Sequence, residues 1–494
     1  MERVRSCETQ PLLGHLEEEE FRTTDEPSVD FDPNGDPDNP MDWTKPYKWG
    51  VVALLFFMAF TVTFTCIGVV PVAERIILDL EGNQSKSASI LLVTVWELGE
   101  AAGPLLIAPL SEIYGRYPVF NVANIIFIIG VLLAAVSETA GLFIFARFLT
   151  GFAVASNVLN PAIIGDIYPS ELRGSGMSLV MLAPLLGGAI GPAISGAIAE
   201  TFGWRKILWI SAVIAVICEI FFFTMLRETY KVPILQRRAA RLRKETNDKS
   251  LKCAWDSDNE GAAMSWLALR AAFTRPMVVL RDSSVLQLLS IYGGLVFSFN
   301  YIMATTLPTI LKNIYGFSPT LIGLSFLAFS FGAGGGIVLC NFFLDSIYLK
   351  LGKSSGGAAL PEYRLPFMIG GAAVLPVVVL LYGWVPYAYW SVGLLLLAVA
   401  GFGFTIIMTW VPLASYIVDA FGLYSASALT MVLISRCLGG TLLPLAIPPL
   451  TDALGLGYGF VVLAAICVAM MPLPVVIMRY GSRWRQSSVY TRNG

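Results

Sequence analysis

Twelve stretches of about twenty mainly apolar residues follow one another along the chain, separated by shorter polar segments. A stretch of this length crosses the ~30 Å hydrocarbon layer of a bilayer as an α-helix. Lipid offers no partner to free backbone N–H and C=O groups, so an unpaired extended segment cannot take the place of a helix. The sequence therefore predicts an all-α membrane protein with twelve transmembrane helices. We expect the spans near residues 50–72, 88–110, 119–137, 142–165, 176–198, 206–226, 285–308, 320–343, 366–384, 388–416, 425–447 and 458–478.

The composition supports a membrane protein and argues against other classes. Of the 494 residues, 56% are apolar and 14% are charged, whereas soluble proteins have roughly 45–50% and about 25%. This is too little charge to cover a soluble surface. A net charge of −2 offers no excess of basic residues for nucleic acid. The seven cysteines form no C-x-x-C pair, so we expect no bound metal and no nucleic-acid partner.

A long polar segment after the sixth span divides the spans into two groups of six. Its basic run, residues 237–244, favours a basic surface helix. With both chain ends in the cytoplasm, 26 of the 33 Lys and Arg residues lie inside and five outside, in accord with the positive-inside rule. We therefore predict a disordered acidic cytoplasmic tail (1–48), an N-terminal six-helix bundle (49–226), a cytoplasmic central loop (227–283), a C-terminal six-helix bundle (284–478) and a cytoplasmic C-terminal tail (479–494).

The two groups of six contain an internal repeat. Gly187-Gly188 in the fifth span recurs as Gly439-Gly440 in the eleventh, 252 residues later. At the same offset, the matched pairs are Pro192 with Pro444, Glu200 with Asp452, and Gly203 with Gly455. A chance match between Gly- and Pro-rich spans is the alternative. The repeat favours two parallel six-helix halves, an arrangement in which transporters bind substrate between the halves.

Charged and glycine motifs lie at the ends of several spans. They are Glu112-x-x-Gly115-Arg116 after the second span, Arg147-x-x-x-Gly151 in the fourth, and Gly191-Pro192 in the fifth. Together these motifs resemble the signatures of the major facilitator superfamily. The resemblance covers residues 39–480. It implies the fold of that family, with twelve transmembrane helices in two six-helix halves around a central cavity.

Four further segments resemble the fungal twelve-span drug:proton antiporters of the cycloheximide-resistance type. They are residues 39–43, 227–230, 361–366 and 416–421. This closer likeness implies export of hydrophobic compounds against inward proton flow, and it links Arg147 to proton coupling. Ala108 and Tyr117 depart from the family pattern, which has a glycine and a second basic residue at these positions. Ser178 and Ser195 replace glycines of the longest antiporter signature.

Two of the motifs have roles that follow from their residue types. Glu112, Arg116 and Asp166 lie at the predicted inner membrane edge, where they can form a charge cluster beside the tight turn at Gly115. Breaking such an inner gate cluster would shift the balance between two conformations; a static topology signal is the alternative. Small residues and a proline in the fifth span favour close packing and a bend. These are Gly187, Gly191, Pro192 and Gly196.

Ionisable residues in the middle of a span are costly, and each is a functional hypothesis. Glu97 and Glu100 lie three residues apart on one helix face, and two such carboxylates do not readily ionise together in an apolar site. We therefore expect this pair, together with Arg147, to couple transport to protons. The alternative is a structural pair neutralised by Arg147 or by polar neighbours. Arg436 requires a buried acid or an anionic substrate.

Polar and aromatic residues of other spans are candidates for a substrate cavity, with helix packing as the alternative role of each. An apolar, aromatic cavity with few polar groups suits amphiphilic molecules better than sugars. We assign to this cavity Asn157, Asn300, Tyr301, Trp410 and Arg436. In the first outside loop, Asn83 begins an N-glycosylation sequon.

The sequence thus predicts a secondary active transporter that exports a drug, toxin or secondary metabolite by proton antiport. A proton-coupled importer of a polyamine or vitamin and a non-transporting sensor are the alternatives. The chain has no His-Glu-x-x-His motif and no complete P-loop, so we expect neither an enzyme nor an ATP-driven pump. We expect a monomer in the cell membrane. Its partners would be a small-molecule substrate, protons and the lipid bilayer, with no cofactor.

Overall fold

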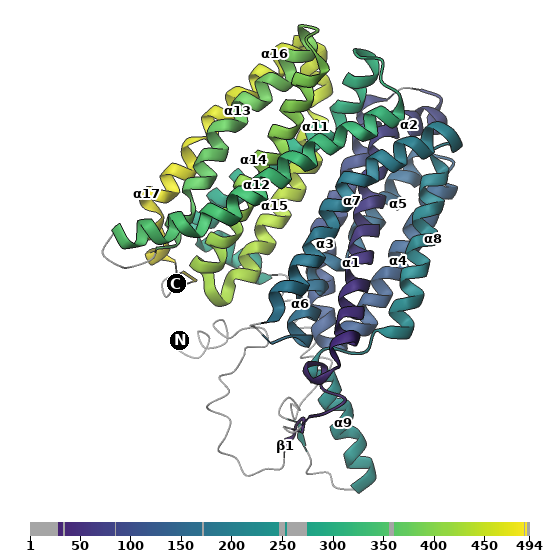
Figure 1. The fold of residues 1–494 in the computed structure, drawn as a ribbon, viewed down its shortest axis with the longest axis vertical. Coiled ribbons are helices and arrows are strands. Elements are labelled where there is room, and N and C mark those ends of the chain that lie inside the picture. Colours follow the sequence, from purple (N-terminus) through teal and green to yellow (C-terminus); the bar gives the residue numbers. More distant parts are fainter. Residues whose placement is uncertain are drawn as a thin grey trace.

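The computed structural model describes residues 28–32, 35–83, 85–169, 172–246, 252–253, 274–354, 360–488 and 490–491. Within these ranges the protein is nearly all helical, with twelve segments long and apolar enough to cross a membrane. This confirms the prediction of an all-α protein with twelve spans. Two short strands of the described part, β1 (Ser28–Val29) and β2 (Lys252–Cys253), pair in parallel outside the bundle (Figure 1).

The N-terminal half contains the first six spans. Its first span is interrupted after Gly68, close to Pro71, which lacks the N–H that a continuous helix needs. Its elements are α1 (Lys45–Gly68), η2 (Val70–Val72), α2 (Ala73–Glu81), α3 (Lys86–Tyr114), α4 (Arg116–Val136), α5 (Ala140–Phe152), α6 (Ser156–Ile167), α7 (Arg173–Phe202) and α8 (Arg205–Met225).

The C-terminal half contains the last six spans and follows a separate helix, α9 (Lys231–Thr246). Its elements are α11 (Ser284–Asn313), α12 (Pro319–Ser354), η4 (Pro361–Arg364), α13 (Pro366–Tyr387), α14 (Val392–Phe421), η5 (Gly422–Tyr424), α15 (Ser425–Leu445), α16 (Ile447–Met470) and α17 (Pro472–Ser487).

The two halves lie together at one end of the bundle and diverge at the other (Figure 1). We call the end at which α1 begins and α17 ends the termini end, and the opposite end the far end. Among the described residues, every hydrogen bond that joins the halves involves Glu100 or a residue nearer the far end. The structure is therefore the conformation in which the far end is closed.

The internal repeat is visible in two reciprocal contacts at the far end. Glu200 of the first half accepts hydrogen bonds from the N–H (3.1 Å) and hydroxyl (2.5 Å) of Thr320, at the start of α12. Its repeat partner Asp452 pairs with Lys86, at the start of α3, at 2.6 Å. Matched acids thus join matched helices across the interface, as expected of two related halves packed face to face.

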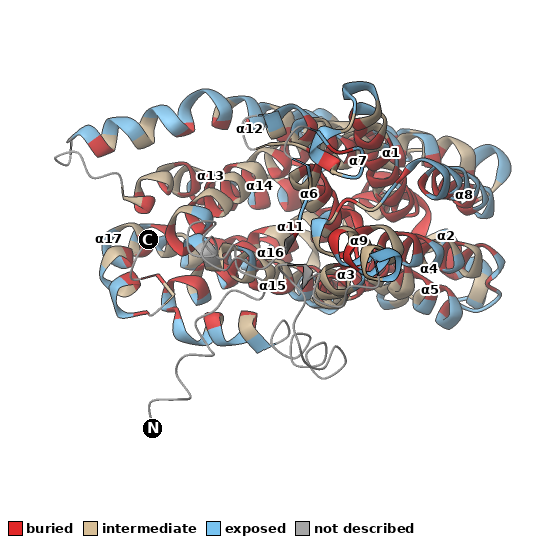
Figure 2. Ribbon diagram, turned by 90° about the horizontal axis from the view of Figure 1, so that it is seen from below, coloured by how far each residue is buried: buried red, intermediate tan, exposed pale blue. Residues whose placement is uncertain are grey.

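The outward faces of the helices carry exposed apolar side chains, and buried residues lie between the helices (Figure 2). Phe331 is 78% exposed and Phe342 is 68% exposed, both on α12. A soluble surface would not tolerate such a belt, whereas a bilayer solvates it.

Two parts of the chain depart from the predicted segment boundaries. Residues 28–48 were expected to be disordered, yet β1 packs Val29 against Leu235 of α9, and α1 already begins at Lys45. Asp36 accepts a hydrogen bond from the backbone N–H of Asp38 and pairs with Arg238. These contacts hold the pKa of Asp36 below its ordinary value. Residues 1–27 lie outside the described residues.

The predicted central loop does contain a basic helix, α9, which projects from the termini end and is seen end-on in Figure 2. The predicted C-terminal tail does not begin at residue 479, because α17 continues through Ser487. Burial of the Arg485 side chain against Glu362 (2.9 and 3.1 Å) fixes this helix to the second half.

Candidate functional site

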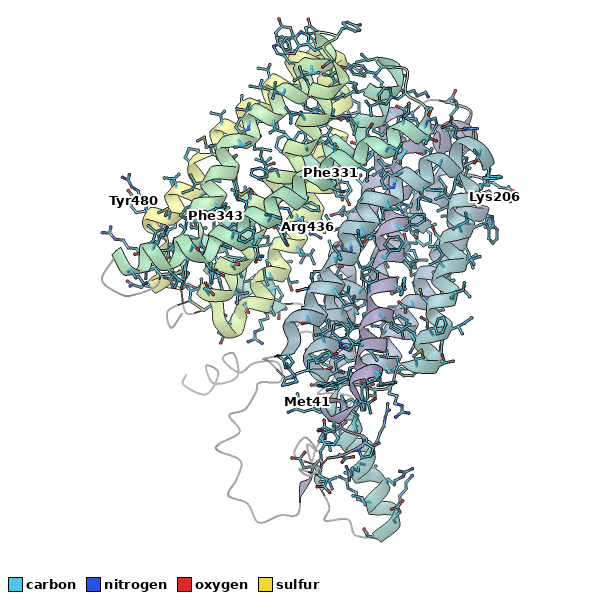
Figure 3. All side chains as sticks on the ribbon, in the orientation of Figure 1. Met41, Lys206, Phe331, Phe343, Arg436 and Tyr480 are labelled. Atoms are coloured by element: carbon cyan, nitrogen blue, oxygen red, sulfur yellow. The ribbon has the colours of Figure 1, made fainter. Side chains whose placement is uncertain are left out.

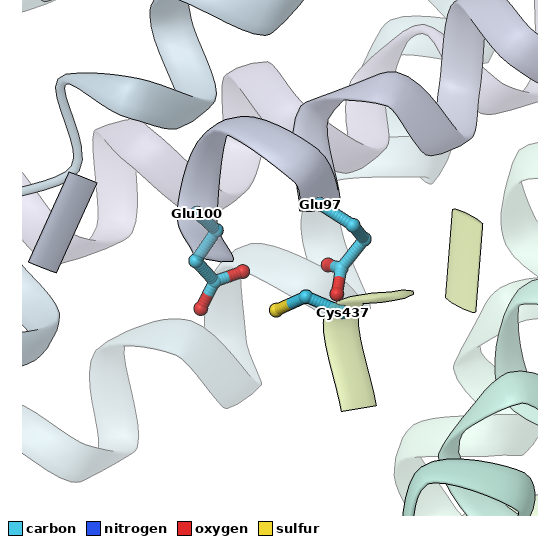
Figure 4. Close-up of side chains that lie close together, drawn as sticks. All are labelled: Glu97, Glu100 and Cys437. Atoms are coloured by element: carbon cyan, nitrogen blue, oxygen red, sulfur yellow. The ribbon is translucent and has the colours of Figure 1, made fainter. Parts of the chain in front are cut away.

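The centre of the molecule is built on one turn of α3. The three-residue spacing of Glu97 and Glu100 places both carboxyls on the same face, and their residues are only 1% and 2% exposed. Figure 4 shows the two side chains directed toward Cys437 of α15. The expected pairing of these two acids at one buried position is therefore present.

Both carboxyls are bonded to the opposite half of the protein. The hydroxyl of Tyr301 on α11 donates to Glu97 Oε1 at 2.5 Å, and Arg436 Nη2 on α15 donates to Glu100 Oε1 at 2.8 Å. Asn157 of α6, which is exposed, donates a further bond of 2.7 Å to Glu100 Oε1. The two glutamates therefore connect the halves directly, at the closed side of the molecule.

Arg436 is placed by aromatic neighbours as well as by Glu100. Its guanidinium lies 4.3 Å from the ring centre of Phe297 and 5.1 Å from that of Trp410, and Figure 3 shows it between the two halves. Such cation–π contacts favour the charged arginine inside an apolar site. The buried acid that the sequence required for Arg436 is thus Glu100. Trp410, Tyr301 and Asn157 contact this same centre, and their role in a substrate cavity stays a prediction.

Two polar atoms of the centre are buried without a hydrogen-bond partner among the described residues: Glu97 Oε2 and Arg436 Nε. Only one arginine forms an ion pair with this pair of acids in the described part of the chain. The arrangement balances one negative charge, and the second carboxyl is best accommodated with a proton.

A metal ion fits this centre less well than a proton does. One atom each of Glu97, Glu100 and Cys437 lies within 4.8 Å of the others. However, Glu100 is already paired with Arg436, and Glu97 accepts the hydroxyl of Tyr301. A divalent cation would have to share this space with the guanidinium, which is unfavourable.

Arg147 forms no ion pair with Glu97 or Glu100 in the described part of the chain, so the alternative in which it neutralises the acid pair is not observed, and its link to proton coupling stays a prediction. Its guanidinium donates to the carbonyls of Thr65 (3.1 Å) and Cys66 (2.8 Å) on α1, and to Leu92 of α3 (3.3 Å). Thr65 and Cys66 belong to the last four residues of α1, whose carbonyls have no helical partner. Arg147 therefore satisfies the broken end of α1 in this conformation.

At the termini end of the first half, the predicted charge cluster is formed only in part. Arg116 Nε lies 3.5 Å from Asp166, whereas Glu112 makes no ion pair in the described part of the chain. Glu228, which sequence reasoning assigned no role, accepts the backbone N–H groups of Arg116 (2.8 Å) and Tyr117 (3.3 Å) at the start of α4. The four-residue segment 227–230 had been singled out by resemblance, but nothing in its pattern pointed to a helix cap.

Gly115 is required for this arrangement. Its φ is +102°, a left-handed conformation that favours glycine, and a Cβ there would collide with the Glu228 carboxylate. Thr229 also donates to Asp166 at 3.2 Å. Tyr230 lies beneath the Arg116 guanidinium at 4.7 Å. Burial, reinforced by nearby Glu112, raises the pKa of Tyr230 to about 12, so its phenol stays neutral.

The second half contains a matching cluster that the sequence did not reveal. Arg364 of η4 pairs with Asp345 of α12 (3.0 Å) and with Asp419 of α14, and it lies 4.5 Å from the Tyr348 ring centre. Asp345 lacks a following Gly-Arg, so a local motif search finds no partner. The partner arginine comes from a segment nineteen residues later in the chain.

The glycines of the fifth span pack α7 against two helices. A Cβ on Gly187 would lie 2.9 Å from Thr63 of α1, and one on Gly191 would lie 3.4 Å from Phe64. Gly196 sits directly against the Pro319 carbonyl of α12. In return, Gly323 of α12 sits against the Pro192 carbonyl. The motif thus brings α7 into close contact with the opposite half near the far end.

Two cavities lie between the halves. One of about 340 Å³ lies at the far end, beside Glu74, Lys86 and Lys312. A second, of about 130 Å³, is lined by Asn300, the remaining member of the predicted cavity set, which makes none of the hydrogen bonds of the centre. Asn83 is exposed between α2 and α3 and lines neither cavity.

Comparison with known families agrees with this architecture. The family model described as Major Facilitator Superfamily matches residues 51–444. The chain belongs to the major facilitator superfamily. Membership makes it a multi-pass membrane transporter rather than an enzyme, as the sequence predicted. The solved D-xylose-proton symporter shares the fold, with a TM-score of 0.64 at 17% identity over 88% of this chain and 97% of that one.

Fungal members of the superfamily are similar over most of their length. The efflux pump radE of Floropilus chiversii is 36% identical across 92% of this chain and 84% of its own. The transporter cpaT of Aspergillus oryzae is 32% identical across 98% of both chains. The predicted resemblance to fungal exporters of this superfamily is thereby confirmed at the level of the family.

Proposed function

We propose that this transporter exports hydrophobic or amphiphilic small molecules in exchange for protons. The observation that carries the proposal is the central network, in which two buried acids of one half bind the other half with one arginine between them. Protonation changes the charge of that network and therefore the energy of joining the halves. The fungal relative named as an efflux pump supports the outward direction.

We infer that this conformation is the state that loads substrate. The positive-inside rule puts the termini end in the cytoplasm of the cell, so closure of the far end makes this the inward-facing conformation. In this state the bond between Glu100 and Arg436 implies an ionised carboxylate, and hence a proton already released to the cytoplasm. The unpaired oxygen of Glu97 suits a carboxyl that keeps its proton.

Substrate and proton then alternate at the same centre. A molecule that competes with Arg436 for Glu100 weakens the joint between the halves and allows the far end to open. With Arg436 withdrawn, the buried Glu100 carboxylate has lost its cationic partner, and we propose that a proton from outside takes the place of that partner. On return, renewed pairing with Arg436 expels this proton inward. One substrate leaves and one proton enters for each exchange at Glu100.

The surroundings of the centre favour amphiphilic substrates. Phe297 and Trp410 offer aromatic faces, while Asn157 and Glu100 offer polar groups within a few ångströms. A substrate with an aromatic or alkyl body and a basic or hydrogen-bonding group can use both features. We also infer a monomer in the cell membrane with both ends cytoplasmic.

The test is transport by purified protein in liposomes under an imposed pH gradient and without ATP. Rhodamine 6G serves as the amphiphilic dye, and a pH dye reports proton movement. We expect dye movement opposite to proton flow in the wild type, and loss of gradient-driven movement in Glu100→Gln.

The matched control is Glu219→Gln. Glu219 is also a buried acid (5% exposed) bonded to an amide, Asn124 Nδ2 at 2.7 Å, but both residues lie within the first half. It should retain gradient-driven exchange. Dye movement in the same direction as protons would identify an importer, and movement indifferent to the gradient would remove both central glutamates from the coupling mechanism.

A further inference from the structure

The 130 Å³ cavity lies between α1, α3, α7, α11 and α12, next to the central acids but separate from their ion pair. Most of its lining is apolar or aromatic; Asn300, Tyr301 and Ser330 are its polar members, apart from the thiol of Cys66. Leu185 and Gly188 of α7 in the first half and Phe326 and Phe329 of α12 in the second half all line it. The cavity is therefore shared by both halves of the transporter.

Two residues that line the cavity also form hydrogen bonds with the buried charged residues described above. Tyr301 lines the cavity with its ring and donates its hydroxyl to Glu97 at 2.5 Å. Cys66 lines it as well, and its carbonyl accepts Arg147 Nη2 at 2.8 Å. An occupant of the cavity would thus contact a residue bonded to the acid pair and a residue bonded to the arginine of the fourth span.

We propose that this cavity is a binding subsite for an apolar group of the transported molecule, such as an aromatic ring or a branched alkyl chain. The inference rests on the proposed transport function and names the part of the substrate that this position holds. The polar group of the same molecule would lie toward Glu97 and Glu100, beyond Tyr301.

Size and chemistry both favour this occupant. A cavity of about 150 Å³ with an apolar lining stays dry and holds a benzene ring, so 130 Å³ suits one ring or a short branched chain and excludes a whole drug-sized molecule. Ten of the fourteen lining residues are apolar, aromatic or glycine and offer no polar side chain to water. An apolar group gains free energy when it leaves water for such a lining.

The position of the cavity also lets a group bound in it influence Glu97 through Tyr301. Because Tyr301 contributes to the cavity wall, a group pressed against its ring holds or displaces the hydroxyl bonded to Glu97. Substrates that fill the cavity should therefore affect the joint between the halves, whereas those without an apolar group should bind weakly and be transported poorly.

Gly188→Leu tests the cavity with little disturbance of the helix. A Cβ at this position would meet only Ile67 Cδ1, at 3.5 Å, an ordinary contact, and the rest of the leucine side chain would occupy the cavity. The matched control is Gly174→Leu on the same helix, about 21 Å away by helical rise, where a Cβ would meet nothing within 4 Å. We expect at least a tenfold rise in the KM for rhodamine 6G in Gly188→Leu and a change below twofold in Gly174→Leu.

Cys66 provides a second measurement that needs no substitution. The wild-type protein in liposomes is treated with N-ethylmaleimide, and mass spectrometry of its peptides follows labelling of each cysteine. Saturating rhodamine 6G should slow labelling of Cys66 at least fivefold. Cys340, which is also buried but does not line the cavity, should be unaffected and serves as the internal control.

Equal KM values in Gly188→Leu and the wild type, together with unprotected Cys66, would overturn the subsite. A rise in KM and protection of Cys66 would establish it even if dye movement ignored the pH gradient, in which case only the proton coupling proposed above would fail. Slowed labelling of Cys66 and Cys340 alike would indicate a general conformational effect and would also count against the subsite.

Discussion

Replacing Glu100 with glutamine should shift the protein away from the conformation described above. The substitution keeps the size of the side chain and removes the charge that Arg436 compensates at 2.8 Å. The side chains are 3% exposed for Glu100 and 16% exposed for Arg436, so water replaces the lost partner poorly. The pair joins the two halves, and its loss therefore penalises the state in which they meet at the centre.

The magnitude follows from the burial of the pair. Removing one partner of a buried ion pair costs about 3–5 kcal/mol. Arg436 keeps its contacts with Phe297 and Trp410, so the lower value applies. With a factor of ten for each ~1.4 kcal/mol, the ratio of the two conformations should change by about a hundredfold.

The assay is a distance measurement by pulsed electron paramagnetic resonance. Spin labels carried by unnatural amino acids replace Tyr114, at the end of α3, and Ala426, at the start of α15, both of which are exposed. These positions lie in different halves near the termini end. The wild type should show mainly a long distance at neutral pH, and Glu100→Gln mainly a shorter one.

The control makes the reasoning refutable. Glu219→Gln removes a buried charge inside one half and should leave the distance distribution unchanged. An unchanged distribution in Glu100→Gln would refute the claim that this pair holds the halves together.

Three further predictions concern other parts of the structure. Arg485→Ala removes the ion-pair partner of the buried Glu362 and should lower the stability of the fold by about 3–5 kcal/mol. Lys86→Ala breaks a pair whose members are 63% and 59% exposed and should lower it by at most ~1 kcal/mol. Thermal unfolding in detergent compares the two variants, and equal losses of stability would contradict the argument. Arg147→Lys cannot supply all the donors that α1 requires and should cost about 1–3 kcal/mol, so an unchanged melting temperature would count against its anchoring role. Gly196→Leu places a side chain against the Pro319 carbonyl and should abolish dye transport. The control variant Gly141→Leu, whose new side chain points into open space on α5, should transport the dye normally. Dye transport by both variants would disprove the need for close contact between α7 and α12.

Much of the central site was predictable because charge in a membrane span is rare. Glu97, Glu100 and Arg436 stand out against apolar neighbours, and the three-residue spacing puts the two acids on one face. Their partners were not predictable, since Arg436 lies 336 residues from Glu100 in the chain. The sequence left both Arg147 and polar neighbours open as partners that could neutralise the acids.

The charge clusters at the termini end illustrate the same limit. Arg116 and Asp166 were identified from motifs, but the cap supplied by Glu228 and the pairing of Arg364 with Asp419 were not. These contacts join segments far apart in the chain, and no local periodicity records them. The side chains that complete each cluster are ordinary charged residues when each is considered alone.

The sequence by itself determined the number of spans, the all-α class and the two related halves, because apolar length and backbone pairing in lipid allow few alternatives. It also determined which buried charges need explanation. Only the tertiary structure decided which charge meets which, which end of the bundle is closed, and where the apolar cavity beside Tyr301 lies. Those features depend on how twelve helices pack against one another, and that packing is set by contacts between residues that the chain order keeps apart.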